Sequence, residues 1–302
     1  MPLATSSTRR AARVITDEAP AAMACLVGPW KLERLVQDGA LARVYQARPA
    51  NSPNHRPPPY AIKILRRDWE HDSAAIGSIR REAAVGQHVR HRRLLPVLSA
   101  RLTEAPYYVV TPWLSGAPLS EQAPSGQPLS LAKALWYVRQ AAEGLDALDQ
   151  AGWMHGDIKP DNIFVGPRGH VTLLDLGFAR RRNETTSAVD RPVAGTVGYM
   201  APEMVTSTLR ADIRSDFYSL GVTLFELLTG RLPVAAHDLA ELAEVHRRLR
   251  PVDVRRWAPG LPLEVARLVR QLMAKEPLRR PQTPRELIER LTRLEIQNFS
   301  AV

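Results

Sequence analysis

Five side chains have the types and surroundings that could bind a divalent cation or an anionic ligand. In chain order they are Lys63 in AIK, Asp157, Lys159 and Asn162 in HGDIKPDN, and Asp175 at the end of VTLLD. Magnesium prefers oxygen ligands such as carboxylates and amides, and it keeps several of its waters. A lysine among apolar neighbours needs an anionic partner. Each residue alone also has a plainer explanation, because a loop aspartate usually forms a turn and a surface lysine can bury its stem and leave its ammonium group in water.

The order and spacing of these strings resemble the bacterial Hanks-type (eukaryotic-like) serine/threonine protein kinases. AIK comes first, a helix-like stretch with Glu82 follows, and HGDIKPDN, DLG and APE come after it. These spacings are about what a protein kinase needs between its catalytic loop, its metal-binding strand end and its activation segment. The resemblance runs from about residue 26 to about residue 294. It implies an α+β fold with a small β-rich N-terminal lobe and a larger helical C-terminal lobe.

The resemblance gives the catalytic loop an expected chemistry, which is transfer of the γ-phosphoryl group of ATP to a protein serine or threonine hydroxyl. Asp157 would orient the substrate hydroxyl and accept its proton, and Lys159 would neutralise charge on the transferring group. A lysine two positions after the catalytic aspartate, as Lys159 is here, is typical of serine/threonine kinases. Thr196, which would contact Asp157 and Lys159, agrees with that specificity.

The expected cofactors are ATP and Mg²⁺. By resemblance, Asn162 and Asp175 bind the metal, while Lys63 holds the α- and β-phosphates and pairs with Glu82. The remaining nucleotide contacts implied by the resemblance lie on the strands around Lys63 and at the hinge between the lobes. They are Val36, Gly39, Val44, Ala61, Thr111, Pro112 and Leu114.

The hinge reads TPWL, with Thr111 at the gatekeeper position. Pro112 has no backbone N–H to donate. By resemblance, adenine needs the carbonyl of Pro112 and the amide and carbonyl of Leu114, so the proline is compatible. If TPWL is merely a strand end at a proline, no nucleotide contact is expected there.

A platform for a protein substrate is expected after DLG. Thr185, Thr186 and Ser187 would lie on the activation segment, followed by Thr196 and by Glu203 of APE. Two further residues have expected structural roles. Arg280 would pair with Glu203, and Asp216 would support the backbone of the catalytic loop. Plain surface charges are the alternative for these residues.

Hydrophobic periodicity indicates the elements that must position these side chains. Strands are expected over 28–37, 41–48, 60–65, 94–104 and 106–114, with one helix over 72–89. After a Gly/Pro/Ser-rich connector at 116–130, helices are expected over 131–151, 215–229, 238–249, 263–274 and 284–295, with a hairpin around GPRGH.

The expected domain layout is one catalytic unit between two short tails. Residues 1–25 are expected to be a disordered tail, 26–295 the kinase domain and 296–302 a C-terminal tail. Within the domain, the N-terminal lobe would span 26–111, the hinge 112–116 and the C-terminal lobe 117–295.

Three departures from the family pattern lie near the expected site. The Gly-rich loop should read GxGxxGxV, but aligned on Val44 this chain has Gln37, Gly39 and Ala42, so only the middle glycine remains. We therefore expect looser ATP binding than a full glycine loop gives. Gly86 stands four residues after Glu82 and weakens the helix. The resulting hypothesis is that this helix swings away from Lys63 until a regulator or a second copy packs on it.

Gly156 is the third departure, because it replaces the arginine usual in the His-Arg-Asp string. By resemblance that arginine clamps a phosphate on the activation segment, and a glycine cannot make such a bond. We therefore expect activity that does not strongly require activation-segment phosphorylation. Replacing Thr185, Thr186 and Ser187 together with Ala should leave most of the activity in a phosphate-transfer assay, and a large loss would contradict this.

The amino-acid composition limits the classes of binding partner and the cellular locations that we expect. The net charge is +10, but the basic residues are scattered along the chain, so we expect a solvated arginine-rich surface and no specific nucleic acid partner. No uncharged apolar run is long enough to span a membrane. Cys25 is the single cysteine and fits a reducing compartment, so a cytoplasmic location is expected. The expected partner is a protein substrate of unknown identity.

Two other function classes compete with an active protein kinase. The depleted glycine loop and Gly86 favour a kinase-like scaffold that binds nucleotide weakly or not at all. A small-metabolite phosphotransferase could share the lobe plan. APE, Thr196 and Arg280 argue against that class, because they belong to a peptide-substrate platform.

Overall fold

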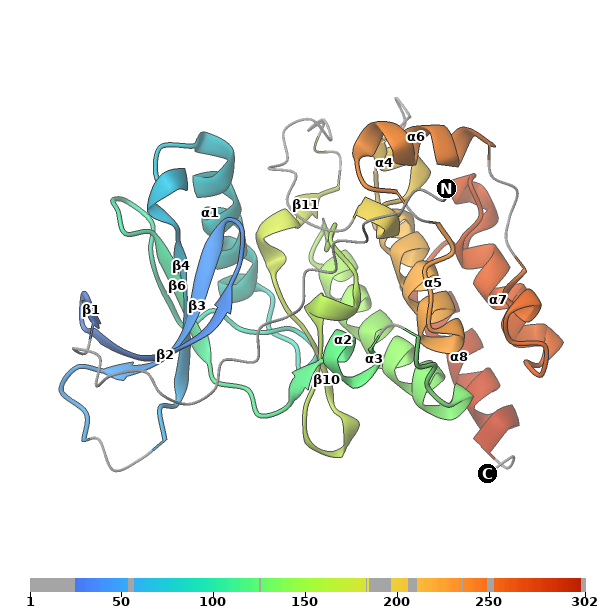
Figure 1. The fold of residues 1–302 in the computed structure, drawn as a ribbon, viewed down its shortest axis with the longest axis horizontal. Coiled ribbons are helices and arrows are strands. Elements are labelled where there is room, and N and C mark those ends of the chain that lie inside the picture. Colours follow the sequence, from blue (N-terminus) through green and yellow to red (C-terminus); the bar gives the residue numbers. More distant parts are fainter. Residues whose placement is uncertain are drawn as a thin grey trace, which may run out of the picture.

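A computed structural model describes residues 25–53, 57–124, 126–182, 184, 197–205, 211–234, 236–248 and 253–299. The fold is α+β in two lobes. Figure 1 shows a β-sheet with helix α1 at one end of the molecule and a group of helices at the other. This is the arrangement that the sequence predicts.

The N-terminal lobe is built on one antiparallel sheet with the strand order β1-β2-β3-β4-β6-β5. Its strands are β1 (Cys25–Val27), β2 (Trp30–Asp38), β3 (Ala42–Pro49), β4 (Tyr60–Leu65), β5 (Ser99–Arg101) and β6 (Tyr108–Pro112). The five predicted strands are present, and β1 adds a sixth at the edge. Helix α1 (Ser73–His88) is capped by Asp72, whose side chain accepts a hydrogen bond from the amide of Ala75 at 2.8 Å.

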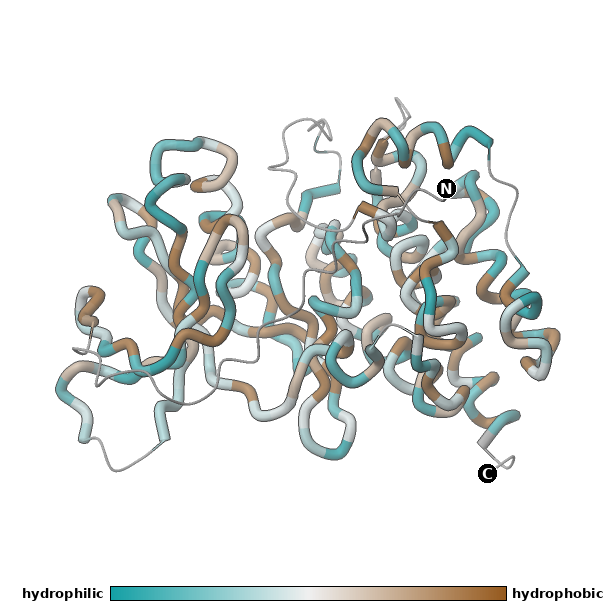
Figure 2. Tube along the Cα trace, in the orientation of Figure 1, coloured by the Kyte–Doolittle hydropathy of each residue, from teal (hydrophilic) through white to brown (hydrophobic). Residues whose placement is uncertain are grey.

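The alternation of side chains along the strands divides the lobe into two small cores. Val109 of β6 packs with Leu65 and the α1 residues Ile79 and Ala83, while Val110 packs with the strand residues on the other face. Successive strand residues point to opposite faces, so one strand serves both cores. In Figure 2 the hydrophobic colour runs along these strands.

The C-terminal lobe is helical. Its helices are α2 (Leu119–Gln122), α3 (Leu131–Gln150), α4 (Pro202–Val205), α5 (Ile213–Thr229), α6 (Leu239–Arg248), α7 (Leu263–Leu272) and α8 (Pro284–Phe299). The predicted long helices are all present, and α8 continues past the predicted domain end at 295. The buried core of this lobe is centred on α5, where Phe217, Leu220 and Phe225 are fully buried.

Short strands hold the site loops on this helical lobe. They are β7 (Ala117–Pro118), β8 (Trp153–Met154), β9 (Ile163–Val165), β10 (Val171–Leu173) and β11 (Arg180–Arg181). The predicted hairpin around GPRGH is the β9–β10 pair. Across the ranges that the structure describes, no helix is long and apolar enough to cross a membrane.

Candidate active site

Three residues from distant parts of the chain meet at one ammonium group. Lys63 lies on β4, Glu82 on α1, and Asp175 just after β10. The Nζ of Lys63 donates to Oε2 of Glu82 at 2.8 Å and to Oδ1 of Asp175 at 2.7 Å. Because β4 and α1 belong to the N-terminal lobe and Asp175 to the C-terminal lobe, Lys63 connects the two lobes.

Burial and charge shift the pKa of all three groups. Burial alone would lower the pKa of Lys63, but the carboxylates of Asp175 and Glu82 outweigh it and raise the pKa. Burial raises the pKa of Glu82 against the opposing pull of Lys63. For Asp175 the effect of burial is overcome by the Lys63 ammonium group, so its pKa is lowered. Two carboxyl groups share one ammonium group, so the cluster has more acidic than basic groups. A divalent cation nearby would balance this difference.

The loop before β9 brings the other predicted residues together. Lys159 Nζ lies 2.9 Å from Asp157 Oδ2. The side-chain amide of Asn162 donates to the carbonyl of Asp157 at 2.7 Å and to its Oδ2 at 2.8 Å. The Asp157 side chain is 22% exposed, so its carboxylate remains accessible from solvent.

Asp216 on α5 holds this loop from beneath. Its two carboxylate oxygens accept hydrogen bonds from the amides of His155 at 2.7 Å and Gly156 at 2.8 Å. Gly156 has φ of 79°, a left-handed conformation that glycine adopts without the Cβ clash of other residues. A buried carboxylate on a long helix therefore fixes the backbone immediately before Asp157.

His155 is fully buried and has one tautomer that satisfies both ring nitrogens. Its Nε2 lies 3.0 Å from the carbonyl of Leu174, so Nε2 carries the proton and donates. Its Nδ1 then accepts from the amide of Asp157 at 3.3 Å. Asp175 follows Leu174 with φ of 58°, a strained conformation of the kind that clusters at functional sites.

Buried neutral histidines predict acid sensitivity. The pKa values of His155 and His246 are lowered, chiefly because burial disfavours the charged imidazole. Between the lowered pKa and about 6.5, the unfolded chain binds more protons than the folded one, so stability is lost as the pH falls through this window. We expect the thermal unfolding midpoint to fall by several degrees from about pH 7 to about pH 5, measured at constant ionic strength.

A variant that lacks one of these two histidines provides the control, because it should lose part of the pH dependence of the unfolding midpoint. A His246→Asn variant should show a shallower decline of the unfolding midpoint over the same window, because its side chain does not titrate there. A midpoint that is constant or rises as the pH falls would contradict the assignment of neutral buried histidines.

The predicted hinge residues lie at the end of β6. Thr111 is buried and lies opposite Ala61 of β4. Trp113 donates its amide to the carbonyl of Pro59 at 2.9 Å. The next amide, that of Leu114, has no hydrogen-bond partner among the described residues, and Leu114 is half-buried. The structure therefore presents a backbone donor at the position where the resemblance implies an adenine contact.

The depleted glycine loop is the turn between β2 and β3. Val36 lies in a β-bulge and is 42% exposed, and Gln37 lies opposite Val44. The amide of Gly39 donates to the carbonyl of Ala42 at 3.0 Å, which closes the turn. Val36, Gly39 and Val44 thus lie on one hairpin as predicted.

The tip of this hairpin is bonded to the segment directly after β4, which includes the short helix Arg67–Trp69. Asp38 accepts from Arg66 at 2.6 Å and from Arg43 at 2.9 Å. The indole N–H of Trp69 donates to the carbonyl of Ala40 at 3.0 Å. These contacts restrain a loop that has lost two of its three glycines. Sequence reasoning did not identify them, since Asp38 and Arg66 look like ordinary surface charges.

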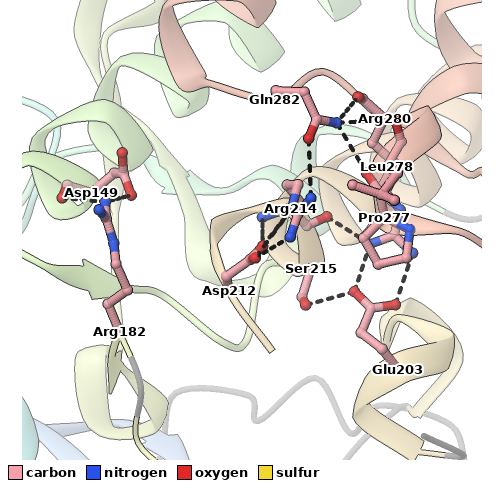
Figure 3. A network of polar contacts seen from close by, with 10 residues as sticks. All are labelled: Asp149, Arg182, Glu203, Asp212, Arg214, Ser215, Pro277, Leu278, Arg280 and Gln282. Atoms are coloured by element: carbon pink, nitrogen blue, oxygen red, sulfur yellow. Dashed lines mark hydrogen bonds and ion pairs between the residues drawn. The ribbon is translucent and has the colours of Figure 1, made fainter. Parts of the chain in front are cut away.

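The predicted Glu203–Arg280 pair is formed and buried. Both guanidinium Nη atoms of Arg280 donate to Glu203, at 2.6 and 2.8 Å, and Ser215 Oγ donates to the same carboxylate at 2.6 Å. The remaining Arg280 donors reach backbone carbonyls, including that of Ala274 at 2.9 Å. Figure 3 shows Arg280 and Ser215 converging on Glu203. Thr185, Thr186, Ser187 and Thr196 lie outside the described residues.

The structure gives Gly86 a packing reason. The amide of Val97 donates to the carbonyl of Gly86 at 3.0 Å, and a Cβ at position 86 would lie 2.6 Å from Val97 Cγ2. Glycine therefore allows α1 to approach the segment before β5 closely. In this structure α1 is engaged, with Glu82 on Lys63, so the hypothesis of a swinging helix stays a prediction.

One cross-lobe contact was missed at the sequence level. Arg81, next to Glu82 on α1, donates to Glu184 at 2.9 Å. The two residues are 103 positions apart, and no local pattern in the sequence joins an arginine on a helix to a glutamate in a loop.

Comparison with known proteins agrees with this geometry. The protein kinase domain family matches residues 30–290. The chain is 31% identical over 260 residues to the serine/threonine-protein kinase PrkC of Bacillus subtilis, covering 86% of this chain and 39% of the relative. It is 30% identical over 271 residues to the serine/threonine-protein kinase PknB of Mycolicibacterium smegmatis, covering 88% and 43%. The chain thus spans about two fifths of the length of these relatives.

Proposed function

Because this chain belongs to the protein kinase family, we propose that it is an ATP- and Mg²⁺-dependent serine/threonine protein kinase. The observation that carries the proposal is the position of Lys63, which lies within 2.8 Å of Glu82 and 2.7 Å of Asp175. This arrangement joins the strand lysine, the helix glutamate and the metal-binding aspartate that phosphoryl transfer by protein kinases requires together. Protein kinases in general act on protein substrates and use ATP with Mg²⁺.

The side chains fit a magnesium–nucleotide complex. Both side-chain N–H donors of Asn162 are directed at Asp157, so its Oδ1 faces away and has no partner among the described residues. Asp175 uses Oδ1 for Lys63 and for the amide of Gly177, and its Oδ2 accepts nothing from the described residues. Two free oxygens, one amide and one carboxylate, suit a cation that completes its shell with phosphate oxygens and water.

The proposed mechanism assigns one task to each side chain. ATP would supply the γ-phosphoryl group, and Mg²⁺ held by Asn162 and Asp175 would neutralise charge on the phosphates. Asp157 would accept the proton of the substrate hydroxyl. At the same time the hydroxyl oxygen would bond to the γ-phosphorus, and the bond from that phosphorus to the β-phosphate oxygen would break. Lys159, within 2.9 Å of Asp157, neutralises charge on the moving group. Lys63 holds the α- and β-phosphates, and Glu82 keeps its ammonium group in place.

The test is phosphate transfer by the purified chain from γ-labelled ATP, with Mg²⁺ and with a chelator. We expect label on serine or threonine of the chain itself or of an added protein such as casein. We expect no label with the chelator or in a Lys63→Met variant. Label on tyrosine alone, or equal label with the chelator, would overturn the proposal.

A kinase-like scaffold is the second candidate, and the depleted glycine loop is the observation that favours it. Gln37 stands on β2 where the family pattern has glycine, so the backbone cannot approach phosphates as freely. In that case the chain would show no transfer, while a thermal shift with nucleotide would be small or absent. Transfer that depends on Lys63 would exclude this candidate.

The glycine loop also gives a quantitative prediction. Replacing both Gln37 and Ala42 with Gly should lower the ATP KM by about threefold, because the backbone can then approach the phosphates. Steady-state kinetics at varied ATP would measure this. Arg43→Gln is the matched control on the same hairpin, since it changes one Asp38 contact and leaves the loop backbone unchanged. A KM that is unchanged or higher in the glycine variant would contradict the prediction.

The partners and location are proposed on the same basis. A protein substrate follows from the family, and a second copy or a regulator that packs on helix α1 remains the proposed means of control.

We expect the reaction to take place in the cytoplasm, where ATP is available and where the free, exposed thiol of Cys25 would stay reduced. Analytical ultracentrifugation of wild type beside a variant with charges placed on the exposed face of α1 would test self-association.

A further inference from the structure

A second contact ties helix α1 to the segment that follows DLG. Arg81 lies directly before Glu82, and its Nη2 donates to Oε1 of Glu184 at 2.9 Å. The two side chains are 32% and 26% exposed, so the pair is partly shielded from solvent. Since α1 belongs to the N-terminal lobe and Glu184 follows β11 of the C-terminal lobe, this ion pair bridges the lobes beside the Lys63–Asp175 contact.

Glu184 is joined to the C-terminal lobe through Arg181. Its Oε2 accepts from the amide of Arg181 at 2.9 Å, and its own amide donates to the carbonyl of Arg181 at 3.0 Å. The guanidinium of Arg181 lies 4.9 Å from the ring centre of Trp153. Arg182, next to Arg181, bonds Asp149 of α3 at 2.6 Å, as Figure 3 shows, but this more exposed pair makes no contact with Glu184. Glu184 is therefore tied to Arg181 of β11, and β11 pairs with β8 in the C-terminal lobe.

Two adjacent helix residues with separate anchors fix the rotation of a helix. Residues 81 and 82 of α1 point about 100° apart around the helix axis. Glu82 reaches Lys63 within its own lobe, and Arg81 reaches Glu184 in the other lobe. Rotation or outward movement of α1 that broke one contact would strain the other.

We propose that Glu184 is a positioning residue whose carboxylate holds Arg81 and thereby keeps Glu82 turned toward Lys63. The inference rests on the proposed function, since it concerns the Lys63–Glu82 pair of that site. The anion that restrains α1 is a side chain built into the sequence. The helix therefore needs no phosphate group to be held in place, which is consistent with a catalytic loop that carries Gly156.

The experiment is a double-mutant cycle on the full chain, with Glu184→Gln, Arg81→Gln and both together. Hydrogen exchange of residues 73–88 reports on the helix, and ATP kinetics report on the site. We expect each single variant to speed exchange in α1 and to lower kcat/KM for ATP by about fivefold. We expect the double variant to be no worse than either single variant, because the two residues act as one pair.

Arg182→Gln is the matched control. It breaks the ion pair of the residue next to Arg181, but that pair lies within the C-terminal lobe and does not touch Glu184, so hydrogen exchange in α1 should stay at the wild-type rate. Unchanged exchange of α1 in Glu184→Gln, or losses that add in the double variant, would overturn the inference. Because exchange needs no turnover, failure of wild type to transfer phosphate would count against the proposed function alone.

Discussion

Replacing Asp157 with Asn should lower kcat by about 10²–10⁴-fold while leaving the ATP KM within about threefold of wild type. Asn cannot accept the substrate proton, yet its carbonyl oxygen can still accept from Asn162 and Lys159, which lie 2.8 and 2.9 Å away in the wild-type chain. The loop should therefore keep its shape and lose its base. Steady-state phosphate transfer at varied ATP gives both constants.

Asp149→Asn is the control for this variant. It removes the same carboxylate charge from an aspartate of α3 that pairs with Arg182 away from the catalytic loop. We expect its kcat to match that of wild type within about twofold. A thermal midpoint of Asp157→Asn near that of wild type would show that lost activity is not lost folding. If Asp157→Asn kept more than a tenth of the wild-type kcat, Asp157 would not be the base.

Glu203→Gln should destabilise the C-terminal lobe by about 3–5 kcal/mol. The substitution leaves the Arg280 guanidinium buried without its counter-charge, and both side chains are almost completely shielded, at 3% and 0% exposed. Ser215 would also lose its carboxylate acceptor, which lies 2.6 Å away. Urea unfolding followed by tryptophan fluorescence measures the free energy of unfolding, and Trp136, Trp153 and Trp257 contribute the signal of the helical lobe.

Arg214→Gln provides a matched comparison for the buried pair. Arg214 pairs with Asp212 close to Arg280, as Figure 3 shows, but these side chains are 24% and 32% exposed. A pair with this exposure contributes at most about 1 kcal/mol. A loss in Glu203→Gln no larger than that in Arg214→Gln would mean that the buried pair does not stabilise the lobe.

The sequence predicts the contacts of the catalytic loop because they are local. Asp157, Lys159 and Asn162 lie within six positions, and in a loop pinned at both ends such residues must lie close together. Lys63, Glu82 and Asp175 are far apart in the chain, and their meeting was expected from the family resemblance rather than from spacing. The strand patterns are clear because β4 and β6 have a core on each face, so they read as short, nearly continuous apolar runs.

The contacts that were missed have no local signal. Arg81 and Glu184 are single charges in a chain with 41 basic and 31 acidic residues, and their meeting depends on how the two lobes are placed. Helix propensity predicts a weak point at Gly86, because propensity describes an isolated helix. Its close approach to Val97 is a tertiary property that propensity cannot predict. Strand β1 has three residues, too few for an alternating pattern.

The left-handed backbone at Gly156 limits how this kinase domain could be re-engineered. Reintroducing an arginine there would place a Cβ at φ of 79°, which costs about 1–2 kcal/mol for an L-residue. Asp216 holds the amide of Gly156 at 2.8 Å, so the peptide cannot rotate to relieve that strain without losing a buried hydrogen bond. A single substitution would therefore weaken the loop beneath Asp157 before it could supply a phosphate-binding side chain.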